Sequence, residues 1–456
     1  MRKNSKIHPS PLHILSPGQM MVAGFGFLIL LGAVLLTSPL SSANGTSTSF
    51  IDALFTATSA VCVTGLVVVD TSIHWSIFGK VVIILLIQVG GLGFMTLGTL
   101  VALIFGKKIN LRQRILIKEA LNQDDLSGSV KLIKKVLKYT LVIEGLGALL
   151  LSFAFIPQFG FLKGIAYSIF TSISSFCNAG FDLMGSISGE YSSIVSYYNR
   201  PLIVFTISAL IILGGIGFPV IINIVNKRHL KKLSLNSKMA LVTTAILIVG
   251  GFLMIFLGEV GHALHGMTLW EKFQVAFFQS VTTRTAGYAT IDLTQFREST
   301  LFVMIILMFI GASPASTGGG IKTTTAAVLF IAVKSFIKNE NEITVQHKRI
   351  NVFTFRKALG IFIIAISIAV LGVYLLSITQ DPKHFDILSC SFEVSSALAT
   401  VGLSLAGSYH LNGVGKVIIM VLMFAGRVGS LTIFTAFISE NKRKRVRYPE
   451  AKVLVG

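Results

Sequence analysis

Eight apolar stretches, each long enough to cross a lipid bilayer, constrain the fold of this chain more than any other feature. A helix needs roughly 20 apolar residues to cross a hydrocarbon core about 30 Å thick. Because lipid offers no hydrogen bonds to the backbone, such segments must be helical. The sequence therefore predicts an all-α membrane protein with eight transmembrane helices. The stretches cover residues 19–38, 77–105, 138–156, 202–225, 239–258, 301–333, 358–377 and 417–438.

The composition excludes a soluble protein. Only 13% of the 456 residues are charged and 53% are hydrophobic, whereas soluble proteins carry about 25% charged residues. The apolar content is also too high for a disordered chain. The sequence contains no cluster of metal ligands or nucleophiles at a membrane interface, and we do not expect an enzyme.

The basic residues predict how the chain is oriented. The net charge is +20, from 39 Lys and Arg against 19 Asp and Glu. In the eight-span arrangement, 29 of the 39 fall on one side, in the amino-terminal segment and in residues 107–138, 227–238, 334–357 and 442–452. Because cytoplasmic segments carry the excess of Lys and Arg, we expect both termini in the cytoplasm and the protein in the plasma membrane. These stretches indicate contacts with anionic lipid rather than nucleic acid.

A fourfold repeat connects the spans. Between the two spans of each pair lies a shorter, Ser/Thr-rich segment that ends at a glycine. The final glycines are Gly65, Gly180, Gly287 and Gly402, separated by 115, 107 and 115 residues. Ten residues before each glycine stands a phenylalanine, namely Phe55, Phe170, Phe277 and Phe392. These segments are too short to span and predict re-entrant half-helices, each followed by a loop.

The repeat also sets the expected domain organisation. Each unit has two crossings, so all four units share one orientation, unlike the inverted repeats of many transporters. We expect repeats over 19–106, 138–226, 239–333 and 358–438. Cytoplasmic segments at 1–18, 107–137, 227–238, 334–357 and 439–456 flank and connect them.

Four like-oriented units can close around a pseudo-fourfold pore. The loops after the half-helices then meet on its axis, because irregular backbone at membrane depth must be buried or line water. Such a pore would be lined by backbone carbonyls. The carboxyl ends of the half-helices carry partial negative charge and favour a cation. Glycine permits the positive φ that turns a carbonyl toward the axis.

These features resemble the Trk/Ktr/HKT superfamily, and most closely the membrane-embedded potassium-translocating subunit of bacterial Ktr systems. The resemblance covers nearly the whole chain. It rests on the predicted filter loops Val63-Thr64-Gly65, Asn178-Ala179-Gly180, Thr285-Ala286-Gly287 and Thr400-Val401-Gly402, on Ser316-Thr317-Gly318-Gly319-Gly320-Ile321-Lys322, on Arg427, and on Arg447-Tyr448-Pro449-Glu450.

The resemblance implies potassium uptake through a channel-like filter with one glycine per repeat, with K⁺ held at the filter carbonyls. Gly65 favours potassium, since serine at this position goes with sodium permeation in the superfamily. Only the fourth loop has Thr-Val-Gly and none ends in Gly-Tyr-Gly, so the expected filter is short and asymmetric. The resemblance further implies a homodimer on a cytoplasmic ring of nucleotide-binding regulatory subunits. ATP or ADP would bind that ring and not this chain, and Na⁺ can stimulate uptake.

Residues 311–320 (GASPASTGGG) interrupt an apolar helix and are a candidate gate. Glycines and a proline oppose a regular helix. The segment is either a mobile intramembrane loop that obstructs the pore or a helix kink packed against a neighbour. It is not a phosphate-binding loop, because Ile321 separates Gly320 from Lys322. The candidate gate residues are Gly311, Pro314, Ser316, Thr317, Gly318, Gly319, Gly320, Lys322 and Arg427.

Arg427 lies within an apolar helix, where an ionised residue is a functional candidate. It either faces the pore as a barrier to cations or binds backbone carbonyls of the 311–320 segment, and both roles are compatible. Three further charged residues lie within apolar segments. Arg284 could brace the third loop from behind, Glu393 could pair with Arg284 or add negative charge near the entrance, and Glu144 is either a packed acid or an interface residue.

The alternative function is a secondary transporter of another small cation or solute. The parallel repeats and the lack of intramembrane carboxylate pairs weigh against it. No span is rich enough in arginine for a voltage sensor.

Overall fold

The computed structural model describes residues 17–93, 129–227, 229–340 and 342–429. Within these residues, four helices are each long and apolar enough to cross a membrane, and the bent pair α9–α10 makes a fifth if it is taken as one span. The chain is thus a helical, multi-pass membrane protein. The four long helices are α1 (Pro17–Thr37), α6 (Ser129–Phe159), α11 (Leu235–Glu259) and α15 (Val352–Thr379).

A short helix follows each long one and packs against it. The predicted half-helices correspond to α2 (Phe50–Cys62), α7 (Phe161–Phe176), α12 (Leu269–Thr282) and α16 (Ile387–Ala399). Two have strong amino-terminal caps: Thr268 and Glu271 form a capping box on α12, and Asp386 accepts from the Ser389 amide on α16. Such caps satisfy backbone amides that a helix end leaves unpaired.

The second helix of the predicted repeat is broken in the second and third repeats, whereas in the first and fourth its described part is a single helix. These helices are α3 (Ile77–Leu92), α9 (Pro201–Gly215) with α10 (Phe218–Lys227), α13 (Glu298–Phe309) with α14 (Thr323–Ile337), and α17 (Gly413–Val428). The prediction of one continuous helix over 202–225 is wrong, because α9 and α10 meet at an angle of 95°. Gly217 takes a φ of +91° at the bend, which a helix cannot contain. The carboxyl-terminal parts of the spans expected at 77–105 and 417–438 lie outside the described residues.

The remaining elements are short. They are the helical turns η2 (Pro39–Ser41), α8 (Gly185–Ser188), η3 (Val195–Tyr197), η4 (Leu230–Lys232), η5 (Leu293–Gln295) and η6 (Ser408–His410), and the antiparallel strands β1 (Thr344–Val345) and β2 (Lys348–Arg349).

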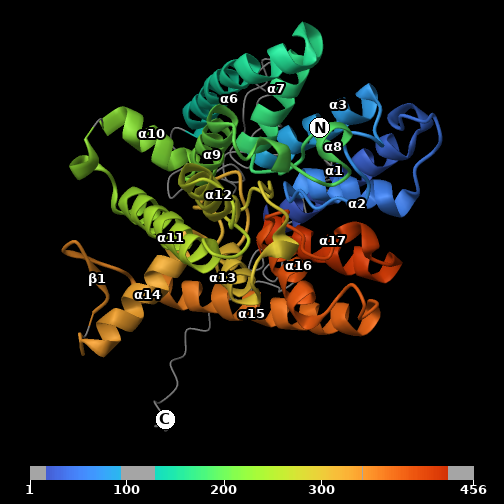
Figure 1. Ribbon diagram of the computed structural model, residues 1–456. Helices are drawn as coiled ribbons and strands as arrows, with labels where there is room; N and C mark the ends of the chain where they lie inside the picture. Colours follow the sequence, from blue (N-terminus) through green and yellow to red (C-terminus); the bar gives the residue numbers. More distant parts are fainter. Residues whose placement is uncertain (1–16, 94–128, 228, 341, 430–456) are drawn as a thin grey trace, which may run out of the picture.

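The elements follow one another around the middle of the molecule. In Figure 1 the colours run in chain order around the centre, from blue helices α1–α3 through α6–α10 and α11–α14 to the orange and red helices α15–α17. The circle closes where α17 packs against α2. At that junction Lys416 Nζ lies 2.5 Å from Asp52 Oδ1. The first and last quarters of the chain also share one apolar core, which includes Phe55, Ile87 and Met423.

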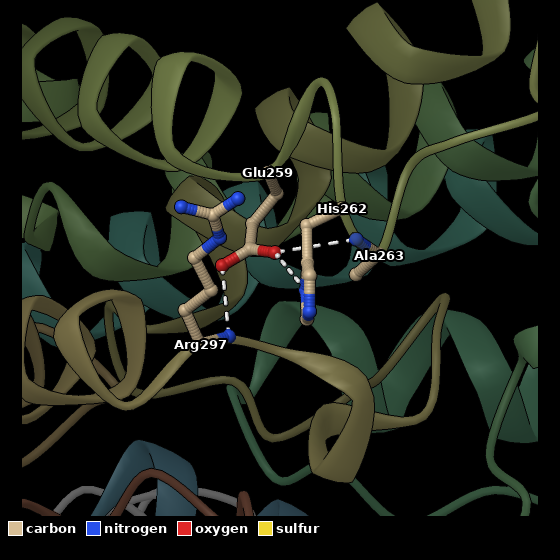
Figure 2. A network of polar contacts seen from close by, with 4 residues as sticks. All are labelled: Glu259, His262, Ala263 and Arg297. Carbon is tan, nitrogen blue, oxygen red and sulfur yellow. Dashed lines mark hydrogen bonds and ion pairs between the residues drawn. The ribbon is translucent and has the colours of Figure 1, made fainter.

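A buried carboxylate joins the end of α11 to the start of α13. Figure 2 shows Glu259 between His262, Ala263 and Arg297. Glu259 Oε1 accepts from the Arg297 amide at 3.0 Å, and Oε2 accepts from the Ala263 amide at 3.4 Å and lies 3.3 Å from His262 Nδ1. The Glu259 side chain is fully buried, and these amides compensate part of its lost hydration. The network fixes the spacing of the two helices that flank α12.

Candidate functional site

The four predicted filter loops share an unusual backbone conformation. The residue two before each final glycine has positive φ: Val63 (+56°), Asn178 (+58°), Thr285 (+67°) and Thr400 (+53°). The glycines follow at +90°, +71°, +83° and +97°. Asparagine tolerates this region, but for β-branched valine and threonine it is a genuine outlier. Strain of this kind persists only where the surroundings enforce it, and it concentrates at functional sites.

The four loops contact one another in a closed cycle. A Cβ added to Gly65 would lie 2.4 Å from the Ala179 carbonyl oxygen, and one added to Gly180 would lie 2.5 Å from that of Ala286. A Cβ on Gly287 would meet the Val401 oxygen, and one on Gly402 would meet the Thr64 oxygen. Each glycine thus faces the carbonyl before the next glycine, and the fourth returns to the first. The structure brings all twelve predicted filter residues together, and any residue other than glycine at the four contact points would displace the facing carbonyl.

Hydroxyl groups of the half-helices anchor the loops from behind. The Gly65 amide donates to Ser59 Oγ and the Gly402 amide donates to Ser396 Oγ, both at 3.0 Å. In the other two loops the hydroxyls of Ser174 and Thr282 donate to the carbonyls one residue after the glycine, both at 2.7 Å. Sequence reasoning noted the Ser/Thr content but missed these roles. The signal was a hydroxyl five or six residues before each glycine.

Glycines of the second helices pack against the half-helix ends. A Cβ on Gly90, Gly214 or Gly426 would lie about 2 Å from a carbonyl oxygen four residues before the filter glycine. The three carbonyls belong to Val61, Phe176 and Leu398. The third repeat differs: the aligned Gly311 faces the Gly319 oxygen instead, and its own carbonyl accepts from Arg284 Nη2 at 3.4 Å.

Residues 311–320, the glycine-rich loop, lie directly against the predicted filter loops. Thr317 Oγ1 donates to Asn178 Oδ1 at 3.2 Å. A Cβ on Gly318 would lie 2.0 Å from Thr285 Oγ1. A Cβ on Gly319 would lie 2.3 Å from Thr400 Oγ1. The loop therefore touches the residue two before the glycine in the second, third and fourth loops.

The glycine-rich loop is an ordered non-helical segment rather than a kink. The Ser313 amide donates to the Gly215 carbonyl at 2.9 Å and the Phe218 amide to the Ala315 carbonyl at 3.0 Å. Both bonds pair backbone groups that the break between α9 and α10 leaves without a partner in a helix. Lys322 Nζ donates to the Gly318 carbonyl at 2.7 Å. Among the other candidate gate residues, Pro314 directs its carbonyl toward Gly217, Gly320 has a φ of +69°, and Ser316 Oγ has no partner among the described residues.

Arg427 binds carbonyls on two sides. Nη1 donates to the Thr317 carbonyl of the glycine-rich loop, and Nη2 donates to Gly90 and, at 3.0 Å, to Gly91 at the end of α3. The guanidinium thus fastens the loop to the first repeat, the one repeat whose filter residue the loop does not touch through residues 317–319. The expected carbonyl-binding role is present in this geometry.

The other intramembrane charges have polar partners. Arg284 is buried, and its bond to Gly311 braces the backbone behind the third loop. Glu393 Oε1 accepts from the Ser404 and Ser408 hydroxyls at 2.6 and 2.9 Å, and no ion pair joins it to Arg284 in the described part of the chain. Glu144 accepts from Gln88 Nε2 at 3.1 Å and is buried, as expected for a packed acid.

Comparison with known proteins decides the family. The family model for TrkH, described as a cation transport protein, matches residues 19–446. The chain belongs to the TrkH family. This confirms membership of the Trk/Ktr/HKT superfamily. The chain is 43% identical to the potassium/sodium uptake protein NtpJ of Enterococcus hirae, over 97% of this chain and 98% of that one. It is 39% identical to the Ktr system potassium uptake protein B of Bacillus subtilis, over 97% of each chain.

A solved structure shows the same fold. The crystal structure of the potassium transporter TrkH from Vibrio parahaemolyticus aligns with a TM-score of 0.72. The alignment covers 96% of this chain and 87% of that chain, at 18% sequence identity. The likeness at this identity concerns the fold alone.

Proposed function

We propose that this family member takes up potassium ions through a pore at the ring of filter loops, which lies on a pseudo-fourfold axis of four repeats and eight crossings. The cyclic contact of the four glycines with the carbonyls of the next loop carries the proposal. The four filter loops have strained backbones and are held in a ring. Their backbone oxygens at membrane depth can replace the hydration shell of a cation.

The charge around the ring favours a cation. All four half-helices end at a filter loop, so their partially negative carboxyl ends converge there. Gly65 and the names of the relatives, which are potassium and potassium/sodium uptake proteins, support potassium as the transported ion. The ion binds to backbone carbonyls and needs no resident cofactor. The membrane potential supplies about 2.3 kcal/mol per charge per 100 mV.

The glycine-rich loop and Arg427 form the gate in this proposal. The loop packs against the second, third and fourth filter loops, and Arg427 fastens it to the first repeat. A guanidinium beside the ion path also adds a positive charge that opposes cations. The arginine therefore holds the loop in place through hydrogen bonds and opposes the passage of cations through its charge.

The arrangement in the cell follows from charge and resemblance. The asymmetry of Lys and Arg supports cytoplasmic termini in the plasma membrane. The names of the Ktr system relatives support a partner subunit. From the resemblance to Ktr systems we propose a homodimer on a cytoplasmic nucleotide-binding ring, whose ATP-bound and ADP-bound states would switch the gate. Stimulation by Na⁺ is part of the same proposal.

Growth on limiting potassium tests the proposal. The chain is expressed, with and without a candidate regulatory subunit, in cells that lack potassium uptake. Wild type should restore growth, and Gly65→Ser should admit sodium and impair growth when sodium is in excess. Equal growth of the two on scarce potassium would refute the filter assignment. Uptake that requires a countertransported solute would favour the secondary transporter instead.

A further inference from the structure

Asn178 belongs to the second filter loop, and its side chain connects the glycine-rich loop to the third filter loop. Nδ2 donates to the Arg284 carbonyl at 3.3 Å and to Thr285 Oγ1 at 3.2 Å, both in the third loop. Oδ1 accepts from Thr317 Oγ1 at 3.2 Å, and the same hydroxyl also lies 3.1 Å from the Phe176 carbonyl oxygen. The side chain is fully buried and each of its polar atoms has a partner. One amide therefore contacts three segments that are far apart in the sequence.

Positive φ alone does not account for this residue. Asparagine suits the left-handed region, but threonine occupies the same position with the same conformation in the third and fourth loops. The Thr285 and Thr400 hydroxyls face glycines of the glycine-rich loop, and Thr400 Oγ1 has no hydrogen-bond partner among the described residues. Of these three side chains, the amide alone carries its donor and its acceptor on separate atoms, so it can bind two segments at once.

We propose that Asn178 is a positioning residue that couples the gate to the filter. It rests on the proposed function, since it assigns a link between the two parts named there. Displacing Thr317 from the filter removes the donor to Asn178 Oδ1. A buried acceptor without a donor is unfavourable, so the amide reorients. Its Nδ2 then loses its hydrogen bonds to Arg284 and Thr285 in the third filter loop. The K⁺/Na⁺ preference of the pore then depends on the position of the glycine-rich loop.

A double-mutant cycle tests the coupling. Thr317→Val and Thr285→Val remove the hydroxyls on the two sides of the amide while keeping the side-chain shape. The readout is the ratio of initial K⁺ and Na⁺ uptake rates of the full-length protein in cells without other potassium uptake. We expect the two effects to be non-additive by about two- to tenfold, the range for one hydrogen-bonded link. Membrane protein levels are measured for every variant.

Two controls separate the amide from direct contact. Thr400→Val combined with Thr317→Val reports coupling through loop packing alone. The effects of these two substitutions should be additive, because Thr400 faces Gly319 and no hydrogen bond of the Asn178 side chain involves Thr400. The Thr317–Thr285 coupling should disappear when Asn178 is replaced by alanine. If Asn178→Ala fails to accumulate, Asn178→Thr gives the same test, since this position accepts threonine in two other loops.

The outcomes distinguish this inference from the proposed function. If Gly65→Ser alters ion preference but the Thr317–Thr285 cycle is additive, or its coupling persists without Asn178, the coupling role is refuted and the filter assignment stands. If Gly65→Ser leaves ion preference unchanged, the filter assignment is wrong and the coupling role is refuted with it.

Discussion

Alanine at any of the four filter glycines should impair the pore to a similar extent. The added Cβ would lie 2.4, 2.5, 2.5 and 2.2 Å from the facing carbonyl oxygen at Gly65, Gly180, Gly287 and Gly402. Real Cβ atoms do not approach below 3.0 Å, so the facing carbonyl must retreat by about 0.5–0.8 Å. Metal–oxygen distances of Mg²⁺ and Ca²⁺ differ by about 0.3–0.5 Å. A displacement of this size is therefore enough to change which cation the ring fits.

The protein should still fold. A non-glycine residue in the left-handed region costs roughly 1–2 kcal/mol, and overpacking costs about 1–3 kcal/mol. Their sum is below the stability of about 5–15 kcal/mol typical of folded domains. We expect a lower Tm and, because misplacing a binding group by 1 Å can cost about 100-fold, a loss of K⁺/Na⁺ preference of at least about tenfold.

A matched control isolates the steric part of the effect. Gly45 also has positive φ (+68°), but a Cβ there would meet nothing within 4 Å. Gly45→Ala should therefore lower the Tm slightly and leave uptake unchanged. The assay compares potassium uptake, sodium uptake and Tm for the five alanine variants. Wild-type ion preference in Gly180→Ala or Gly287→Ala would refute the closed ring of filter loops.

Three further predictions concern the gate and the scaffold. Arg427→Ala should raise potassium flux, because it frees the glycine-rich loop and removes a positive charge; unchanged or lower flux in a folded variant would contradict the gate. Gly318→Ala should also raise flux, since its Cβ would lie 2.0 Å from Thr285 Oγ1 and displace the loop, whereas Gly250→Ala, with nothing within 4 Å, should resemble wild type. Glu259→Ala should cost about 1–3 kcal/mol by removing a charged acceptor from the part-buried amides of Ala263 and Arg297, measured as a lower Tm; a Tm equal to wild type would argue against the link between α11 and α13.

The short helices and the glycine-containing loops that follow them could be predicted because their signals are local. A Ser/Thr-rich apolar run of about a dozen residues that ends at glycine is too short to span, and four such runs at similar spacing reinforce one another. The bend at Gly217 was missed because hydropathy measures apolar content along a run and not its direction. Residues 202–225 are apolar on both sides of the break.

Long-range side-chain contacts could not be predicted. Asn178 and Thr317 lie 139 residues apart, and the sequence around either residue does not predict a contact with the other. Pairing with Arg284 was one of the two roles open to Glu393, yet the two serines that follow it by 11 and 15 residues supply its hydrogen bonds. Hydroxyls near a buried carboxylate satisfy it at lower cost than a second buried charge. Arg427 and the glycine-rich loop were identified because an arginine and a glycine cluster are rare within apolar helices.

Arg284 explains why the glycine-rich loop belongs to the third repeat. In the other three repeats the residue three before the filter glycine is Cys62, Cys177 or Ala399, each small enough for a helix glycine to reach the half-helix end. Arg284 is the long, buried residue at this position in the third repeat, and its Nη2 donates to the Gly311 carbonyl at 3.4 Å. α13 ends at Phe309, and we interpret Arg284 as the residue that keeps the following loop away from the half-helix end. On this account, Arg284→Ala would let the chain at Gly311 approach the half-helix, draw the glycine-rich loop away from Thr285 and Thr400, and raise flux. Reduced flux in a folded Arg284→Ala protein would show that the arginine supports the filter itself rather than the course of the loop.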